Sequence, residues 1–156
     1  MNNSPLNKLI GIWEGNKGMD IAPEDGGQED NPYYETLTIE PVDTEIENAD
    51  TQELLAVRYH QLVKEKANDD VSHSETGYWI WDKNENTIMN SFSIPRGVCV
   101  LAGGEVSQKD CNETVFNVLA KLDDSNFGII QSIFMKMNIK ERNPCTSITF
   151  TNNLIV

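Results

Sequence analysis

The stretch Val71–Asp82, with the sequence VSHSETGYWIWD, constrains the fold more than any other part of the chain. Successive side chains of a strand face opposite ways, so Tyr78 and Trp79 would place aromatic rings on both of its faces. His73 and Glu75 are two residues apart and share one face, where they can form a hydrogen-bonded pair. Polar groups among aromatic side chains, on a strand buried on both sides, are typical of a small barrel around a partly polar cavity.

The composition excludes several classes of partner. The chain has 156 residues, a formal net charge of -13 and an isoelectric point near 4.4. Such an acidic chain repels phosphate groups, so we expect neither nucleic acid nor an anionic membrane as a partner. The three cysteines lie far apart without metal-type spacing, which indicates reduced thiols. Because the sequence shows no leader and no apolar run of about 20 residues, we expect one soluble domain over residues 1–156, in the cytoplasm.

Alternating apolar and polar residues predict strands along most of the chain, with turn residues between them. The predicted strands cover residues 11–21, 33–42, 53–66, 71–82, 87–94, 98–106, 114–122 and 145–150. Ser4-Pro5 predicts a short helix over residues 5–10, because serine caps helices and proline suits their first position. The polar segment 22–32 is predicted as a loop. Segment 127–140 is ambiguous, and its latter part could form a helical turn.

The last residues predict an incomplete barrel. Asn152-Asn153 suits a two-residue hairpin turn, because asparagine tolerates positive φ. The return strand would then stop after three residues, as in a truncated barrel or in one that a partner completes. Eight or nine strands, joined mostly by hairpin-length loops, predict an all-β fold. We therefore expect a single antiparallel up-and-down β-barrel with a short N-terminal helix.

Three motifs resemble the nitrobindin family, whose members are small antiparallel β-barrels shaped like fatty-acid-binding proteins and lipocalins. The motifs are GIWEG at residues 11–15 with a further glycine at Gly18, HSETGYW at residues 73–79, and GVCVLAGG at residues 97–104. The resemblance runs in the same order from Leu9 to about Val156. The segments NPYYET (31–36) and RYHQ (58–61) are similar to a bacterial branch of that family.

The resemblance implies a non-covalently bound haem b. Family members hold it with an axial histidine near the C-terminus and carry another histidine near its distal face. They are credited with binding nitric oxide and with isomerising peroxynitrite to nitrate. His73 matches the distal-side histidine, Trp13 matches the tryptophan of the first strand, and Gly11 and Gly15 match its glycines. The axial histidine has no counterpart here, because no histidine follows His73.

Polar and aromatic side chains of these segments are the candidates for ligand binding. They are Trp13, Tyr59, His60, His73, Glu75, Trp79 and Arg96. The tryptophans would line the barrel, and Tyr59 or Arg96 could hold a carboxylate of the ligand. His73 is also the candidate iron ligand, although a lone histidine in a strand is more often a hydrogen-bonded wall residue. Arg96, in a Pro-Arg-Gly turn, is better explained as a surface turn residue.

These observations leave three functional hypotheses. The first is a binding protein for a small hydrophobic or planar molecule, with haem b as the ligand that the resemblance implies. The second is an enzyme, a haem-dependent peroxynitrite isomerase, which ranks lower because the axial ligand has no counterpart. The third is a ligandless barrel whose open edge pairs with another copy to form a homodimer. The sequence carries no nucleophile elbow, phosphate-binding loop or dinucleotide motif that would indicate another chemistry.

Overall fold

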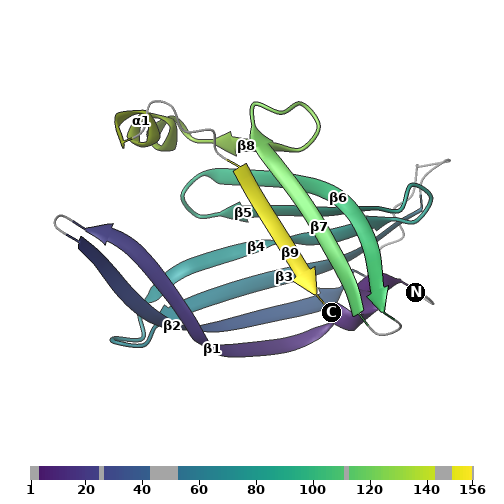
Figure 1. Ribbon diagram of the computed structural model, residues 1–156, viewed down its shortest axis with the longest axis horizontal. Helices are drawn as coiled ribbons and strands as arrows, with labels where there is room; N and C mark the ends of the chain where they lie inside the picture. Colours follow the sequence, from purple (N-terminus) through teal and green to yellow (C-terminus); the bar gives the residue numbers. More distant parts are fainter. Residues whose placement is uncertain (1–3, 25–26, 43–52, 111–112, 143–148, 156) are drawn as a thin grey trace.

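One sheet of nine strands curls through the whole molecule and forms a half-barrel (Figure 1). The computed structural model describes residues 4–24, 27–42, 53–110, 113–142 and 149–155. The elements are η1 (Pro5–Leu9), β1 (Gly11–Glu24), β2 (Gly27–Pro41), β3 (Leu54–Glu65), β4 (Val71–Asp82), β5 (Thr87–Ile94), β6 (Val98–Asp110), β7 (Glu113–Leu122), β8 (Gly128–Gln131), α1 (Ile133–Arg142) and β9 (Thr149–Ile155). The expected all-β class is therefore confirmed, and η1, a 3₁₀ helix, occupies the predicted N-terminal position.

The strands follow the order β1-β2-β3-β4-β5-β6-β8-β7-β9. The first six are joined up and down in antiparallel fashion, as predicted. The sheet as a whole is mixed, however, because β8 runs parallel to β7 while it pairs antiparallel with β6. The expectation of a purely antiparallel barrel is wrong at this point.

A tight loop between β7 and β8 explains the parallel pair. Asp123 adopts a φ of 63°, in the left-handed region that reverses the chain sharply. The carboxylate of Asp124 then accepts hydrogen bonds from the backbone N–H groups of Asn126 (2.8 Å) and Phe127 (3.0 Å). These two bonds lower the pKa of Asp124, because they favour its charged form. The chain thus turns twice within a few residues and returns beside the end of β7.

Two other predictions of local structure are wrong. The segment 22–32 is largely strand, because β1 continues to Glu24 and β2 begins at Gly27 as the two arms of one long hairpin. The predicted turn at Asn152-Asn153 lies inside β9, where the two asparagines pair with Val118 and Asn117. In both places ladder pairing with a neighbouring strand overrides residues of low strand propensity. The first four residues of the predicted strand 145–150 lie outside the described residues.

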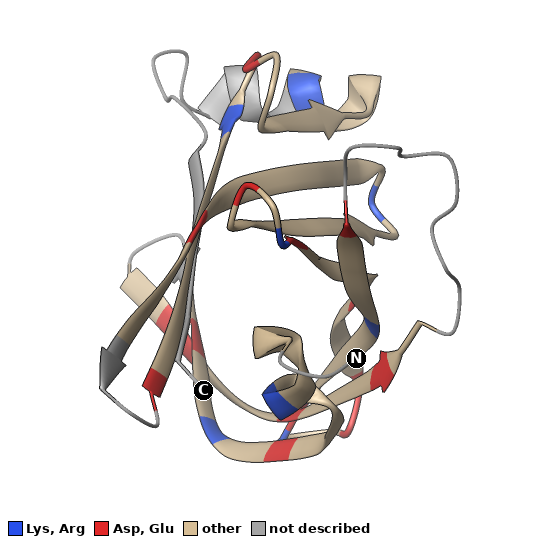
Figure 2. Ribbon diagram, turned by 90° about the vertical axis from the view of Figure 1, so that its right-hand side faces the viewer, with Lys and Arg blue, Asp and Glu red and all other residues tan. Residues whose placement is uncertain are grey.

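The helix η1 fills one end of the half-barrel. Its side chains Leu6 and Leu9 are 1% and 3% exposed and belong to the hydrophobic core. Figure 2 shows η1, beside the N-terminus, inside the curl of the sheet. At the same end the rings of Trp79 on β4 and Phe116 on β7 lie with their centroids 5.9 Å apart. Because β4 and β7 are not neighbours in the sheet, this contact packs two separate parts of the curl against each other.

The curl has two edges, β1 and β9. Among the described residues, β1 pairs with β2 alone and β9 pairs with β7 alone. On β1 the apolar side chains Ile12 and Ile21 are 71% and 58% exposed. The half-barrel is therefore open along one side, between its first and last strands.

Candidate functional site

The pairing register defines the inner face of the sheet. Directly paired residues of antiparallel strands point to the same face. Trp13 pairs with Leu37, Leu37 with Gln61, and Gln61 with Glu75. Leu37 packs against the hydrophobic core, so this row of side chains lies on the concave, inner face. The row begins with a half-exposed tryptophan and ends with a carboxylate.

A second row lies one step nearer to η1. In this row Ile39 pairs with Tyr59, Tyr59 with Gly77, and Gly77 with Phe92. A Cβ atom at Gly77 would lie only 2.2 Å from the backbone oxygen of Ser91, so the sheet requires glycine here. Across β4, the hydroxyl of Tyr59 on β3 reaches the side chain of Asn90 on β5.

The inner face carries a continuous chain of polar contacts. Asn90 on β5 donates from Nδ2 to the hydroxyl of Tyr59 over 3.2 Å. The Tyr59 hydroxyl in turn donates to Oε1 of Glu75. The other oxygen of Glu75, Oε2, lies 3.4 Å from Nε2 of His73. Four polar side chains from β3, β4 and β5 are thereby linked, and Asn90 at their inner end is fully buried.

Burial keeps Tyr59 protonated. Its pKa lies well above the ordinary value, first because burial disfavours the phenolate and second because the charge and hydrogen bond of Glu75 do the same. The hydrogen bond from Asn90 acts in the opposite direction and is the smaller effect. Tyr59 is therefore a fixed hydrogen-bond donor to the carboxylate of Glu75. The side chain of Glu75 is only 14% exposed, so its negative charge is held in a largely water-poor environment.

A second carboxylate lies beside this chain. Gln61 donates from Nε2 to Oε1 of Glu35 over 2.6 Å. Glu35 pairs with Gly15 on β1 and with Val63 on β3, so on the β1 side only a glycine faces it. The ring of Tyr33, two residues before Glu35, lies over Gly18 so closely that a Cβ atom there would be 2.1 Å from it. Glycines of β1 thus leave room for the polar and aromatic side chains of β2.

The structure brings most of the predicted site residues together. Trp13, Tyr59, His73, Glu75 and Trp79 occupy inner-face positions of the register. Trp13 also donates from its indole N–H to the carbonyl oxygen of Leu9 over 2.8 Å. Trp79 is buried against Phe116, at the filled end, whereas the side chain of His73 is 39% exposed.

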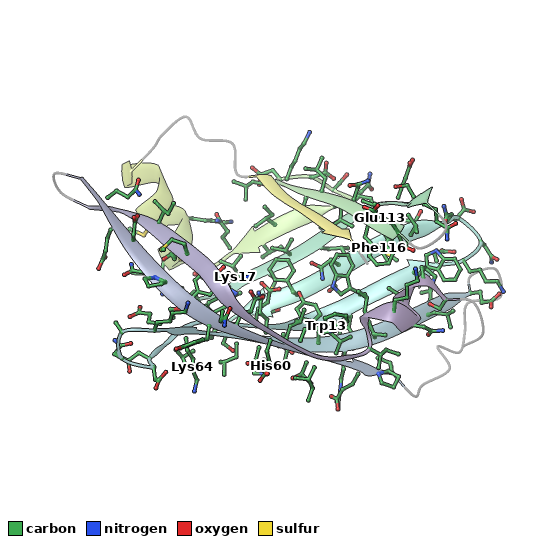
Figure 3. The ribbon with its side chains drawn as sticks, turned by 60° about the horizontal axis from the view of Figure 1, so that its bottom comes forward. Trp13, Lys17, His60, Lys64, Glu113 and Phe116 are labelled. Atoms are coloured by element: carbon green, nitrogen blue, oxygen red, sulfur yellow. The ribbon has the colours of Figure 1, made fainter. Side chains whose placement is uncertain are left out.

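Two predicted site residues lie elsewhere. His60 is exposed on the outer face, where its Nε2 is 3.2 Å from the hydroxyl of Ser74 (Figure 3). Because Tyr59 and His60 are consecutive in a strand, they face opposite ways. Arg96 is exposed in the turn between β5 and β6, and its carbonyl oxygen accepts a hydrogen bond from Ser132. Within the described residues, no group of three or more His, Cys, Asp or Glu side chains is arranged to hold a metal ion.

Three polar residues of the inner face were not among the predicted site residues. Glu35, Gln61 and Asn90 each occupy an inward position in a strand whose other inward positions are mostly apolar or aromatic. The signal was present in the alternation, because Glu35 is two residues before Leu37 and Gln61 two residues after Tyr59. This alternation identifies site residues only when the inward face of each strand is known.

A single curled sheet, filled at one end and lined with linked polar groups at the other, defines a small β-barrel domain of the ligand-binding type. The chain belongs to the family of THAP4-like, heme-binding β-barrel domains, whose model matches residues 2–141. This is the nitrobindin family, so the resemblance of the three motifs is confirmed. Searches of the curated proteins and of the solved structures gave no match. No helix in the described part of the chain is long and apolar enough to cross a membrane.

Proposed function

We propose that the inner face is a binding site for a small, largely apolar molecule with one polar end. The observation that carries this proposal is the hydrogen-bonded chain through Asn90, Tyr59, Glu75 and His73 on an otherwise mostly apolar face. A few oriented polar groups among apolar and aromatic side chains are the usual make-up of a small-molecule site. Membership of a heme-binding β-barrel family supports the same class of function.

Trp13 supplies the apolar surface for such a molecule. It occupies an inner-face position next to Leu37, yet it is 50% exposed. A tryptophan buries more apolar area than any other side chain when a partner covers it, and half-exposed aromatic surface in a concave site is typical of ligand contact. A ligand lying against Trp13 and Leu37 would place its polar end near Gln61 and Glu75, which continue the same row.

The described residues fit haem poorly. Haem iron takes its axial ligand from His, Cys, Met or Tyr. The imidazole on the described inner face is that of His73, and its Nε2 already faces Glu75 at 3.4 Å. The buried phenol of Tyr59 donates to the same carboxylate, and its raised pKa disfavours the phenolate that would bind iron. We therefore propose binding of a small molecule without requiring haem, and we assign no isomerase chemistry to these residues.

A fluorescence titration with the neutral planar probe N-phenyl-1-naphthylamine tests this proposal. We expect saturable one-to-one binding, weakened at least about fivefold by Trp13→Ala and by Leu37→Gln, because both remove apolar contact area. His60→Ala, on the outer face, is the matched control and should bind as the unaltered protein does. Absence of saturable binding, or equal binding by the inner-face and outer-face variants, would overturn the proposal.

A parallel titration with hemin tests whether the protein binds haem through an iron ligand. If iron is not ligated, the Soret band of hemin will stay that of the free compound, and His73→Ala will change nothing. A saturable Soret shift that is lost in His73→Ala and kept in His60→Ala would show that His73 leaves Glu75 to bind iron. That result would restore haem as the ligand while leaving the inner face as the site.

A further inference from the structure

We propose that the inner-face site selects ligands whose polar end is a protonated amine. This inference rests on the proposed function, since it names the class of molecule that the same face would bind. It follows from the balance of charge on that face, from the way its two central carboxylates are held, and from the aromatic side chains beside them.

The strand positions of the inner face carry several carboxylates, and the basic side chain that faces one of them is His73, beside Glu75. Acidic residues at inner-face positions of the register include Asp20, Glu29, Glu35, Glu65 and Glu75. No Lys or Arg occupies a paired inner-face position of the described strands. Lys17, in the bulge of β1, is exposed and takes part in none of the ion pairs among the described residues. A cationic ligand would therefore meet an excess of carboxylates over basic side chains at the strand positions of this face.

The hydrogen bonds orient the two carboxylates without neutralising them. Glu75 accepts from the neutral hydroxyl of Tyr59, and Glu35 accepts from the neutral amide of Gln61. Gln61 is the direct cross-strand neighbour of Glu75, so the two carboxylates lie on either side of one amide. His73 faces Oε2 of Glu75 and is the one titratable group here that can carry a positive charge.

Glu35 has the more available oxygen of the two carboxylates. Its Oε1 is occupied by Gln61, whereas Oε2 accepts no hydrogen bond from any described residue. On the β1 side it faces Gly15, which has no side chain to cover it. An ammonium group has three donors and no acceptor, so it can bond to this oxygen and satisfy it.

Aromatic rings flank the same carboxylate. Tyr33 lies two residues before Glu35 on the inward side of β2, and Trp13 lies two residues before Gly15 on the inward side of β1. Cations bind favourably over the faces of Trp and Tyr rings, and more so where water is excluded. An amine attached to a flat apolar body would thus meet a carboxylate with its charged end and aromatic surface with its body. An anionic end would meet repulsion at the same place.

Three ligands with one naphthalene ring and different polar ends test the inference. 1-Naphthylmethylamine is cationic, 1-naphthylmethanol is neutral and 1-naphthylacetate is anionic at pH 7. By isothermal titration calorimetry with the full chain, we expect the amine to bind about tenfold more tightly than the alcohol, as a charge-assisted hydrogen bond predicts. The acetate should bind more weakly than the alcohol.

Two glutamate variants test which side chains cause the preference for the amine over the alcohol. Glu35→Gln keeps a hydrogen-bond acceptor for Gln61, and Glu75→Gln keeps one for Tyr59, but each removes a charge. We expect either change to weaken binding of the amine more than binding of the alcohol, and so to bring the two affinities close together. Glu40→Gln is the matched control, because Glu40 pairs with Arg58 at 2.9 Å among exposed side chains and its loss changes the net charge equally.

The outcomes separate this inference from the proposed function. Equal binding of the three ligands, tightest binding of the acetate, or an amine preference that survives both glutamate variants would overturn the inference and leave the inner face as a binding site. If none of the three ligands and no neutral planar probe binds, the proposed function fails and the inference fails with it. If Glu75→Gln unfolds, Glu35→Gln still decides, because Glu35 is only half-buried.

Discussion

At the scale of single residues, Tyr59 shows how one side chain links the core to the candidate site. Its ring is buried among apolar neighbours, while its hydroxyl accepts from Asn90 and donates to Glu75. Charged hydrogen-bond partners of this kind stabilise a fold more than neutral ones, and an orphaned buried partner is costly. Tyr59 therefore contributes to stability through its protonated form, which makes its contribution depend on pH.

We expect the free energy of unfolding to fall above about pH 10, and to fall less steeply in Tyr59→Phe. In the unfolded chain a tyrosine loses its proton near pH 10, whereas burial raises the pKa of Tyr59 in the folded state. Above pH 10 the unfolded state releases a proton that the folded state keeps, so rising pH favours unfolding. Urea denaturation at pH 8 and at pH 10.5, followed by tryptophan fluorescence, measures how much stability the unaltered protein and the variant each lose between these pH values.

The matched control for this change is Tyr78→Phe, because Tyr78 is exposed on the outer face. At pH 8 the Tyr59→Phe variant should itself be less stable by about 1–3 kcal/mol, since Glu75 and Asn90 lose a partner. An unchanged loss of stability between the two pH values in Tyr59→Phe would show that another group causes it.

At the scale of elements, η1 is the piece that fills the barrel end. It is too short to be stable alone, because an isolated helix of this length is marginal in water. The hydroxyl of Ser4 accepts from the backbone N–H of Leu6 over 3.2 Å and caps its first turn. Burial of Leu6 and Leu9 against the strands then holds it in place. The hairpin of β1 and β2 shows the same dependence on context, since pairing extends it through residues that favour loops.

We expect Leu6→Ala to lower the free energy of unfolding by about 2–5 kcal/mol, the range for a fully buried leucine that leaves a cavity. Ile10→Ala is the matched control, because Ile10 follows η1 directly and is exposed. It should change stability by less than about 0.5 kcal/mol. Chemical denaturation of both variants measures the difference, and equal stabilities would mean that η1 does not support the core.

At the scale of the whole molecule, the open side of the half-barrel is the main structural consequence of the topology. The edge strands β1 and β9 have no ladder partner on one side among the described residues. Unpaired edges associate readily with other strands, and a charged residue on the edge opposes this. Among the described side chains of β1, the apolar one with the largest exposed fraction is Ile12, so it is the one on this edge that most favours self-association.

We therefore expect the protein to self-associate through β1 and expect Ile12→Lys to reduce that association. Sedimentation velocity over a range of protein concentrations measures the fraction of dimer. Leu101→Lys, on β6 and away from both edges, tests whether the added charge alone is responsible. If the unaltered protein stays monomeric at all concentrations, association through the open edge is ruled out.

Much of the fold could be predicted from residue pattern alone. The predicted bounds of β4 and β5 coincide with the observed strands, because strict alternation and clear turn residues mark both. The parallel pairing of β8 could not be predicted, since it depends on where a short loop returns to the sheet.

In the site, His73 and Glu75 were identified together because they share one strand. Glu35, Gln61 and Asn90 come from three other strands, and only the register brings them to that place.

By itself the sequence determined that this chain is a curled sheet of the nitrobindin family, because alternation and short motifs act locally along each strand. It also determined that Tyr59 and His60 face opposite ways, because consecutive strand residues always do. Only the tertiary structure decided which of the two faces inward, and that the hydroxyl of Tyr59 reaches Asn90 across β4. The physical reason is that a register slip of one residue would reverse every facing side chain, and packing across the whole sheet selects the register.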